Sequence, residues 1–292
     1  MAAEEHGMNA GEYIVHHLTH LQNHKPASVV DFTTFNFDSL FWTIALGVIT
    51  CWLLWRAARK ATSGVPLRFQ AAVEIMVEMV DSQAKGIVHN AVSRKFVAPL
   101  ALTVFIWITL LNAMDLVPVD LLPFIWQHIA GATGHNPEHA YMRVVPTADL
   151  SISMGLSVAV LLICLYYNVK IKGLSGWAHE LVTAPFGTSK NPIFAVLLGV
   201  VNFSMQLIEF VAKTVSHGMR LFGNMYAGEL LFLLIALLGG AFTLSATGLV
   251  LAALHIFAGT VWAIFHILII ILQAFVFMML ALVYVGQAHD AH

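Results

Sequence analysis

Four charged side chains lie within one long apolar stretch of the sequence, between Ile193 and Leu238. They are Glu209, Lys213, Arg220 and Glu229. Inside a membrane each such group costs about 3 kcal/mol or more, so a membrane protein that keeps them generally uses them to move ions or protons. Carboxyl and imidazole groups can pass protons through a wet crevice, since both can titrate near neutral pH there. The chemistry that these residues suggest is therefore proton transfer.

A polar stripe runs through the same stretch at helical spacing. Its members follow one another at steps of three or four residues: Asn202, Gln206, Glu209, Lys213, His217, Arg220 and Asn224. Such steps keep side chains on one face of an α-helix, which turns about 100° per residue. We expect one long helix whose stripe faces something other than lipid. The alternative is a loop, but no proline or turn cluster interrupts the stretch.

Arg220 divides the possible proton path. Glu229 lies nine residues later, about 180° around the helix and about 13.5 Å along it, so the two side chains cannot simply pair with each other. A guanidinium does not release its proton in a protein, so Arg220 interrupts a proton wire. Two half-paths on either side of it need a mobile acceptor. No carboxylate of this chain shares the stripe close to Arg220, so we expect an acidic group of another subunit to be that acceptor.

The elements that position these residues are predicted to be membrane helices. The 292 residues are 59% hydrophobic and 10% charged, against about 25% charged residues in soluble domains. A net charge of -2 argues against a nucleic-acid binder. Cys51 and Cys164 both fall in apolar runs and are interpreted as buried structural thiols without a disulfide framework. Several histidines stand near the N-terminus, but a single row on one helix cannot surround a metal ion, so no metal site is predicted.

The predicted fold is all-α and polytopic, with a polar periplasmic segment 1–38 followed by a membrane domain 39–292. The five expected spans cover residues 40–55, 96–117, 148–167, 193–238 and 249–285. An amphipathic helix over 67–95 should lie on the membrane surface. The last two spans are about 69 Å and about 55 Å long as helices, against a hydrocarbon core of about 30 Å. We therefore expect a steeply tilted helical hairpin.

Further polar residues are expected near this hairpin. On its returning helix, His255, Trp262, His266 and Gln273 recur at steps of seven, four and seven residues. This spacing can bring His266 and Gln273 to the depth of Glu229 and Arg220. Asn112 and Asp115 share one face at the end of the second span. Asp120 and Asp149 are interpreted as solvated interface residues, within or beside polar loops.

The distribution of basic residues predicts the orientation. Of the 14 lysines and arginines, ten fall on one side of the predicted spans, two on the other and two within the membrane. Because cytoplasmic loops carry an excess of lysine and arginine, the N-terminus should be periplasmic and the C-terminus cytoplasmic. An odd number of spans agrees with this orientation.

Three segments carry a resemblance to a known family: MRLFGNMYAGEL, AIFHILIIILQAF downstream and MDLVPVDLLP upstream. From about Phe35 to Tyr284 the chain resembles subunit a of the bacterial F-type proton-translocating ATP synthase, in particular gammaproteobacterial members. The resemblance implies a stator subunit of the inner membrane that has no cofactor and is no enzyme on its own. It also implies contacts with lipid, with the rotor ring of subunit c and with the peripheral-stalk subunit b.

The resemblance further implies residue roles. Arg220 would attract the ionised carboxylate of each passing rotor subunit and block a proton short circuit. The outer half-channel would contain Asn112, Asp115, Asn224, Glu229, His266 and Gln273. The inner half-channel fits less well, because Gln206 stands where close relatives have a glutamate. We expect Glu209, one turn further on and next to Lys213, to replace that carboxylate, and Lys213 to snorkel toward the cytoplasmic surface.

Several alternatives stay open on the sequence. Glu229 and His266 could be mutually satisfied core groups that carry no proton, and Gln273 could simply hold two helices together. A self-contained secondary transporter or channel would require inverted repeats with broken helices, and we find no repeat. An intramembrane hydrolase would require a nucleophile with a base at its depth, and no GxSxG sequence occurs. Ser151 and an insertion at 242–260 depart from the family pattern, and the insertion has no assigned role.

Overall fold

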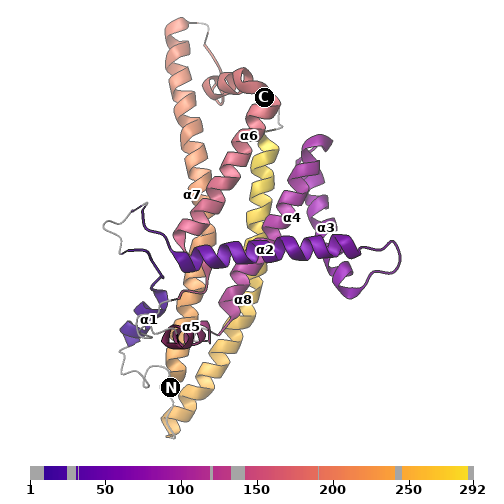
Figure 1. Ribbon diagram of the computed structural model, residues 1–292. Helices are drawn as coiled ribbons and strands as arrows, with labels where there is room; N and C mark the ends of the chain where they lie inside the picture. Colours follow the sequence, from indigo (N-terminus) through magenta and orange to yellow (C-terminus); the bar gives the residue numbers. More distant parts are fainter. Residues whose placement is uncertain are drawn as a thin grey trace. The chain divides into compact units, whose positions relative to one another are not determined.

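The computed structural model describes residues 10–24, 31, 33–118, 121–132, 142–189, 191–240 and 245–288. Within these ranges the chain forms α-helices and short 3-10 helices, and no strand beyond one isolated bridge between Gln22 and Asn36. Five helices are long and apolar enough to cross a membrane: α2 (Phe37–Lys60), α4 (Ala91–Ala113), α6 (Leu150–Thr183), α7 (Pro192–Gly240) and α8 (Ala246–Gln287) (Figure 1). The predicted all-α membrane fold and its five spans are confirmed.

The surfaces of these helices are apolar as well. No more than a third of the most apolar window of any of the five is buried within the chain. Large apolar side chains such as Ile208 on α7 and Leu268 on α8 are about 60% exposed. Exposed apolar area of this extent requires lipid or a partner protein around it.

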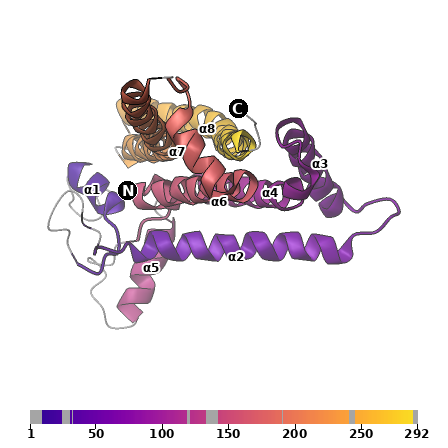
Figure 2. The same ribbon diagram turned by 90° about the horizontal axis from the view of Figure 1, so that it is seen from above.

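The predicted surface helix over 67–95 is two separate elements. Helix α3 (Arg68–Ile87) ends before Val88, and α4 already begins at Ala91. The Asn90 side chain accepts hydrogen bonds from the backbone N–H groups of Val92 at 2.9 Å and Ser93 at 3.3 Å. An asparagine in this position caps a helix N-terminus, so 91–95 belong to the second span. Helix α3 folds back beside the first turns of α4 (Figures 1 and 2).

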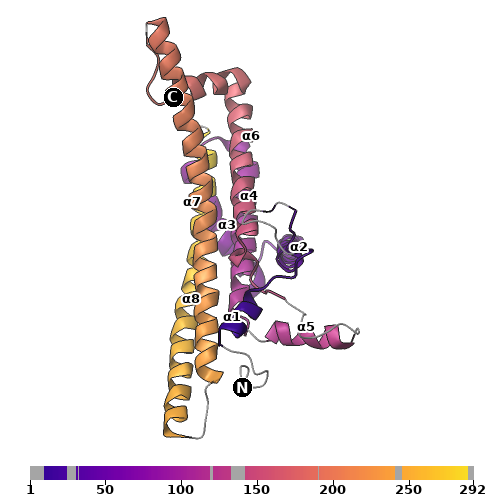
Figure 3. The same ribbon diagram turned by 90° about the vertical axis from the view of Figure 1, so that its left-hand side faces the viewer.

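Helix α6 consists of two helices that meet at a kink at Gly173. The first of them continues past Tyr167, where the third span was predicted to end, up to this kink. The chain turns sharply at Gly173, whose φ of 71° and ψ of 161° are not helical (Figure 3). This backbone region is essentially restricted to glycine. A single glycine therefore redirects the polar end of α6 instead of ending it.

Two shorter helices also occur where polar segments were expected. Helix α1 (Ala10–Leu18) precedes α2, and α5 (Leu121–Ala132) follows the 3-10 helix η1 (Met114–Leu116). A second 3-10 helix, η3 (Pro146–Ala148), leads into α6. The segment between the second and third spans, expected to contain polar loops, thus includes the largely apolar helix α5.

Helices α7 and α8 are uninterrupted, with 49 and 42 residues, and so about 74 Å and about 63 Å long. They run antiparallel and side by side (Figure 3), as the pairing of Asn224 with Gln273 and of Lys213 with Gln287 requires. The long helical hairpin is thus as the sequence predicts. Its tilt in the membrane stays a prediction.

The chain divides into two compact units, described separately below. The first unit comprises 1–56, 106–152 and 221–275, and the second comprises 57–105, 153–220 and 276–292. In the first, Ile108, Leu111 and Leu233 are fully buried. In the second, Phe277 and Met278 are similarly buried.

Candidate functional site

Arg143 and Glu229 form a buried ion pair in the first unit. Helix α7 carries Glu229, and Arg143 lies in the segment before η3. The Arg143 Nη2 is 2.5 Å from a Glu229 carboxylate oxygen, and its Nε lies 3.2 Å from both oxygens. Arg143 is 6% exposed and Glu229 7%, so each charge is compensated almost entirely by the other. Nothing in the sequence pattern indicates Arg143 as the partner of Glu229.

Asp115 and His266 form a second buried pair in the same unit. Their Oδ2 and Nε2 atoms are 2.7 Å apart, and η1 and α8 supply the two residues. Gly228 on α7 leaves room for the pair. A Cβ atom there would lie 3.0 Å from Asp115 Oδ2 and would collide with the His266 ring. His266 therefore pairs with Asp115 and not with Glu229.

The remaining outer residues lie in the same unit. The Asn224 side chain donates a 2.7 Å hydrogen bond to Gln273 Oε1, which confirms that the polar positions of α7 and α8 face each other there. This hydrogen bond joins α7 to α8 through Gln273. Asn112 is fully buried, and both polar atoms of its amide lack a partner among the described residues.

A small cavity of about 30 Å³ adjoins both buried pairs. Asp115 and Glu229 line it together with apolar side chains of the first unit, and His17 of α1 reaches its wall. A cavity of this size holds about one or two water molecules. The carboxyl groups of Asp115 and Glu229 can therefore share a hydrated space although protein surrounds both.

The N-terminal segment contributes to the same site. The His20 Nε2 lies 2.9 Å from Arg143 Nη1, and its Nδ1 lies 3.3 Å from Asp38 Oδ1. His20, one of the N-terminal histidines for which no metal site is predicted, is therefore part of a polar network. The sequence offered no signal for this contact, because both partners come from segments distant in sequence.

Asp149 also differs from its prediction as a solvated residue. It is buried and accepts hydrogen bonds from the Asn36 side chain at 2.7 Å and from the Ser151 backbone N–H at 2.9 Å. It thereby caps the start of α6. Ser151 contributes this N–H, and its residue is exposed. Asp120, interpreted in the same way as Asp149, lies outside the described residues.

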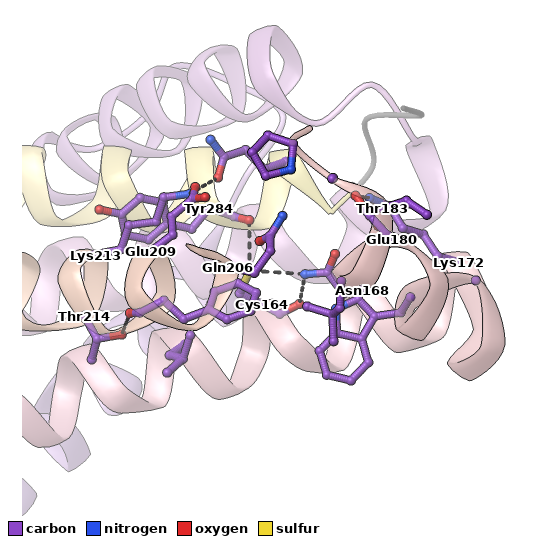
Figure 4. A pocket seen from close by; sticks show the side chains of 18 of the residues that line it. Cys164, Asn168, Lys172, Glu180, Thr183, Gln206, Glu209, Lys213, Thr214 and Tyr284 are labelled. Carbon is purple, nitrogen blue, oxygen red and sulfur yellow. Dashed lines mark hydrogen bonds and ion pairs between the residues drawn. The ribbon is translucent and has the colours of Figure 1, made fainter. Parts of the chain in front are cut away.

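The second unit contains a cavity of about 920 Å³ between α6, α7 and α8 (Figure 4). The three predicted inner residues, Gln206, Glu209 and Lys213, all line it. Lys213 Nζ lies 2.5 Å from the Glu209 carboxylate and donates a 2.8 Å hydrogen bond to Gln287. The ammonium group is thus bound by two neighbours, and whether it reaches the cytoplasmic surface stays a prediction.

The cavity has further polar groups besides the three predicted residues. Lys172 and Glu180 form an ion pair of 2.7 Å, on the two sides of the bend at Gly173 (Figure 4). The buried Cys164 donates its S–H to the Tyr284 carbonyl at 3.1 Å. Cys51, by contrast, is exposed, so the prediction of a buried thiol is right for Cys164 and wrong for Cys51.

Two members of the polar stripe have structural roles. The Asn202 amide donates to the carbonyl oxygens of Val182 at 2.8 Å and Gly187 at 3.2 Å, which fixes the chain after α6. The His217 ring is buried with its centroid 3.8 Å from that of Phe277. The stripe therefore packs the helix at some positions and lines a cavity at others.

Arg220 differs from the other charges of α7. It is exposed, and it forms no hydrogen bond or ion pair with the part of the chain that the structure describes. Gly223, one turn later, has nothing within 4 Å of the place where a Cβ atom would stand. The guanidinium therefore has open surface around it.

The sequence model of the family described as ATP synthase A chain matches residues 40–286. The chain belongs to this family. It is 70% identical to ATP synthase subunit a of Paracidovorax citrulli (strain AAC00-1) and 68% identical to that of Acidovorax sp. (strain JS42), over the full length of both chains in each case. The ATP synthase subunit a of Acinetobacter baumannii (strain SDF) is 43% identical, again over both full lengths.

The family resemblance inferred from the three sequence segments is thereby confirmed. The family is that of a membrane subunit of the ATP synthase, so the chain is part of that complex and not an enzyme on its own. The five apolar helices make it a multi-pass protein of a bacterial membrane.

Proposed function

We propose that the chain is the stator subunit a of an F-type proton-translocating ATP synthase, and that it provides two offset proton half-paths separated by Arg220. Arg220 is the observation that carries the proposal. The charged side chains Glu209, Lys213 and Glu229 of the same helix have partners within the chain, whereas Arg220 is exposed and unpaired among the described residues. Proton flow past it would then depend on a group from another subunit.

The chemistry of arginine supports this separation. A guanidinium donates hydrogen bonds but does not release its proton, and a cation on a membrane helix is stable only beside an anion or water. An ionised carboxylate on each subunit c of the rotor ring would supply that anion. The open space at Gly223 is consistent with close approach of a partner helix, as small residues permit in membranes.

The outer half-path is assigned to the first unit. Asp115, His266 and Glu229 are groups that can exchange protons, and the cavity beside them has room for water. Asn112, Asn224 and Gln273 would orient that water or these groups. Glu229 is paired with Arg143, and His266 with Asp115. A proton would therefore bind to Glu229 or His266 only when the partner of that residue moves away.

The inner half-path is assigned to the larger cavity of the second unit, in which Glu209 is the carboxylate. Its side chain is 50% exposed and paired with Lys213, so it can exchange protons with water while the lysine stabilises its charge. Gln206 lines the same space and cannot carry a proton itself. In sequence, Arg220 lies eleven residues after Glu209 and nine before Glu229.

The orientation and the remaining partners belong to the same proposal. The excess of lysine and arginine on one side assigns the N-terminus, with segment 1–38, to the periplasm and the C-terminus to the cytoplasm. The membrane domain 39–292 would lie in the bacterial inner membrane. It would contact the ring of subunit c and the peripheral-stalk subunit b.

The experiment is to assemble the complex with Arg220→Ala in membrane vesicles and to measure ATP-driven proton pumping and passive proton leak. We expect coupled pumping to be lost and the leak to be kept or raised. Arg68→Ala, at the exposed start of α3, is the matched control and should pump normally. Near-normal pumping by Arg220→Ala would exclude the proposed role of the arginine.

A further inference from the structure

His20 connects the N-terminal segment to the outer ion pairs. It follows the end of α1, and its ring lies between Asp38 at the start of α2 and Arg143. The Asp38 side chain also binds the backbone next to His20 and at Arg143. Its Oδ2 accepts hydrogen bonds from the N–H of Leu21 at 3.1 Å and from the N–H of Arg143 at 3.0 Å. The carboxylate therefore holds His20 and Arg143 next to each other.

The contact with Arg143 requires one protonation state of His20. A guanidinium only donates hydrogen bonds, so the Nε2 atom 2.9 Å from Arg143 Nη1 must be the acceptor. The proton of a neutral ring then sits on Nδ1, which faces Asp38 Oδ1 at 3.3 Å. Both ring nitrogens are thus used, and the neutral ring is fixed in one tautomer.

Arg143 needs this acceptor because it is buried. Its Nε and Nη2 groups bind Glu229, and its Nη1 binds His20. A buried N–H group that loses its partner costs about 1–3 kcal/mol, and more when the group is charged. His20 therefore stabilises the orientation in which the guanidinium lies on Glu229.

The charges around His20 determine what a proton on its ring does. Asp38 from α2 faces Nδ1, Arg143 faces Nε2, and Glu229 from α7 lies on the far side of the guanidinium. The Ser39 hydroxyl, 3.4 Å from Nδ1, is neutral. Protonation replaces the acceptor at Nε2 with an N–H group and puts two positive charges side by side, so the contact with Arg143 is lost while that with Asp38 is strengthened.

We propose that His20 is a positioning residue of the outer half-path. Its uncharged ring keeps the Arg143 guanidinium in contact with Glu229, and protonation of the ring releases Arg143 from this position. Glu229 is then freer to accept a proton when the outer side is acidic. This inference rests on the proposed function for its effect on proton uptake. The position of Arg143 next to Glu229 is a structural property that can be measured separately.

The first measurement follows the segment around Arg143 and does not depend on proton transport. A spin label is attached at Met142→Cys, half-buried beside Arg143, in the assembled complex with its other cysteines replaced. Label mobility in the otherwise unchanged chain should rise as the pH falls from about 8 to about 5, the range in which histidine changes charge. With His20→Gln, which keeps an acceptor but takes up no proton, mobility should stay low throughout. With His20→Leu it should be high throughout.

The second measurement follows the consequence for function. ATP synthesis by vesicles is recorded against the pH of the outer side. We expect His20→Gln to flatten the rise in rate toward acid pH, and His20→Leu to lower the rate at every pH. His24→Gln is the matched control, since His24 is 44% exposed and should leave both profiles unchanged.

The two measurements separate the possible failures. Label mobility that is the same with His20, Gln and Leu overturns the proposal. An acid dependence of synthesis that His20→Gln leaves unchanged overturns the role in proton uptake, even if Arg220→Ala leaks as expected. Conversely, label mobility that depends on pH in the unchanged chain and loses this dependence with His20→Gln supports the positioning role of His20. That result stands even if Arg220 proves not to be a barrier.

Discussion

At the scale of single residues, the predicted outer residues form two buried pairs beside one small cavity. Asp115 pairs with His266, and Glu229 with Arg143. A buried polar group that is left without its partner is costly, so a proton can move onto one member of a pair only if the other member shifts. Proton transfer at these residues would therefore depend on the positions of the paired atoms, and one added atom can disturb those positions.

Gly228→Ala tests that fit. The added Cβ atom would meet the His266 ring and would stand 3.0 Å from Asp115 Oδ2, so the pair must move. Displacement of reacting groups by about 1 Å can cost about 100-fold in rate. We expect a loss of proton pumping of that order in vesicles with normal amounts of assembled complex.

Gly155→Ala is the control for the glycine substitution itself. Gly155 lies within α6, and nothing stands within 4 Å of its Cβ position. Alanine there should stabilise the helix by about 0.5–1 kcal/mol and leave pumping intact. Equal pumping by the two variants would contradict the importance of the Asp115–His266 geometry.

Glu209→Gln tests the inner carboxylate. The substitution keeps the shape of the side chain in the cavity but removes its charge, its proton capacity and the ion pair with Lys213. If Glu209 replaces the glutamate expected at Gln206, pumping should fall at least about tenfold, because proton exchange by a positioned group contributes about 100-fold or more. A Glu209→Gln variant that pumps normally would falsify that assignment.

At the scale of helices, regular helical spacing in the sequence predicted the long helices correctly, whereas local bends and helix ends were missed. Helical spacing predicted α7 and α8 as unbroken helices and brought Asn224 to Gln273. The same pattern could not reveal the turn at Gly173, since a glycine in a helical sequence is usually tolerated without a bend. Asn90, the cap that separates α3 from α4, was missed because the amphipathic pattern runs on past it.

Gly173→Ala tests the bend in α6. The position has open space around it but a φ of 71° and a ψ of 161°, which cost a residue with a side chain about 1–3 kcal/mol. We expect a lower thermal stability of the assembled complex and less of it in the membrane. Gly176→Ala, in ordinary contact with Lys172 at 3.7 Å, should show neither effect; equal stability of both variants would contradict the strained bend.

At the scale of the whole molecule, composition alone identified a membrane protein, whereas the sites depended on contacts that no pattern contains. The predicted outer residues lie in one compact unit and the inner ones in the other. Arg143 and His20 were missed because they come from segments outside the regular helices. Their contacts with Asp38 and Glu229 arise from tertiary packing, and a polar residue in a loop gives no sign of that in its sequence.

The orientation is a prediction at this scale. Single cysteines at His24 and at Gly64, both in exposed positions, would be placed in a chain whose Cys51 and Cys164 have been replaced. A membrane-impermeant thiol reagent added outside intact cells should label the cysteine at 24 and spare the one at 64. The reverse pattern would contradict the periplasmic N-terminus.

The central claim is that the outer and inner half-paths are in series and that Arg220 separates them. The most direct measurement compares passive proton leak in vesicles that carry Arg220→Ala alone with leak in vesicles that also carry Glu229→Gln. The account predicts a high leak in the single variant and a return to the unsubstituted level in the double variant, because the outer path is then closed. A double variant that leaks as fast as the single one would contradict the account, since protons would then cross the membrane without passing Glu229.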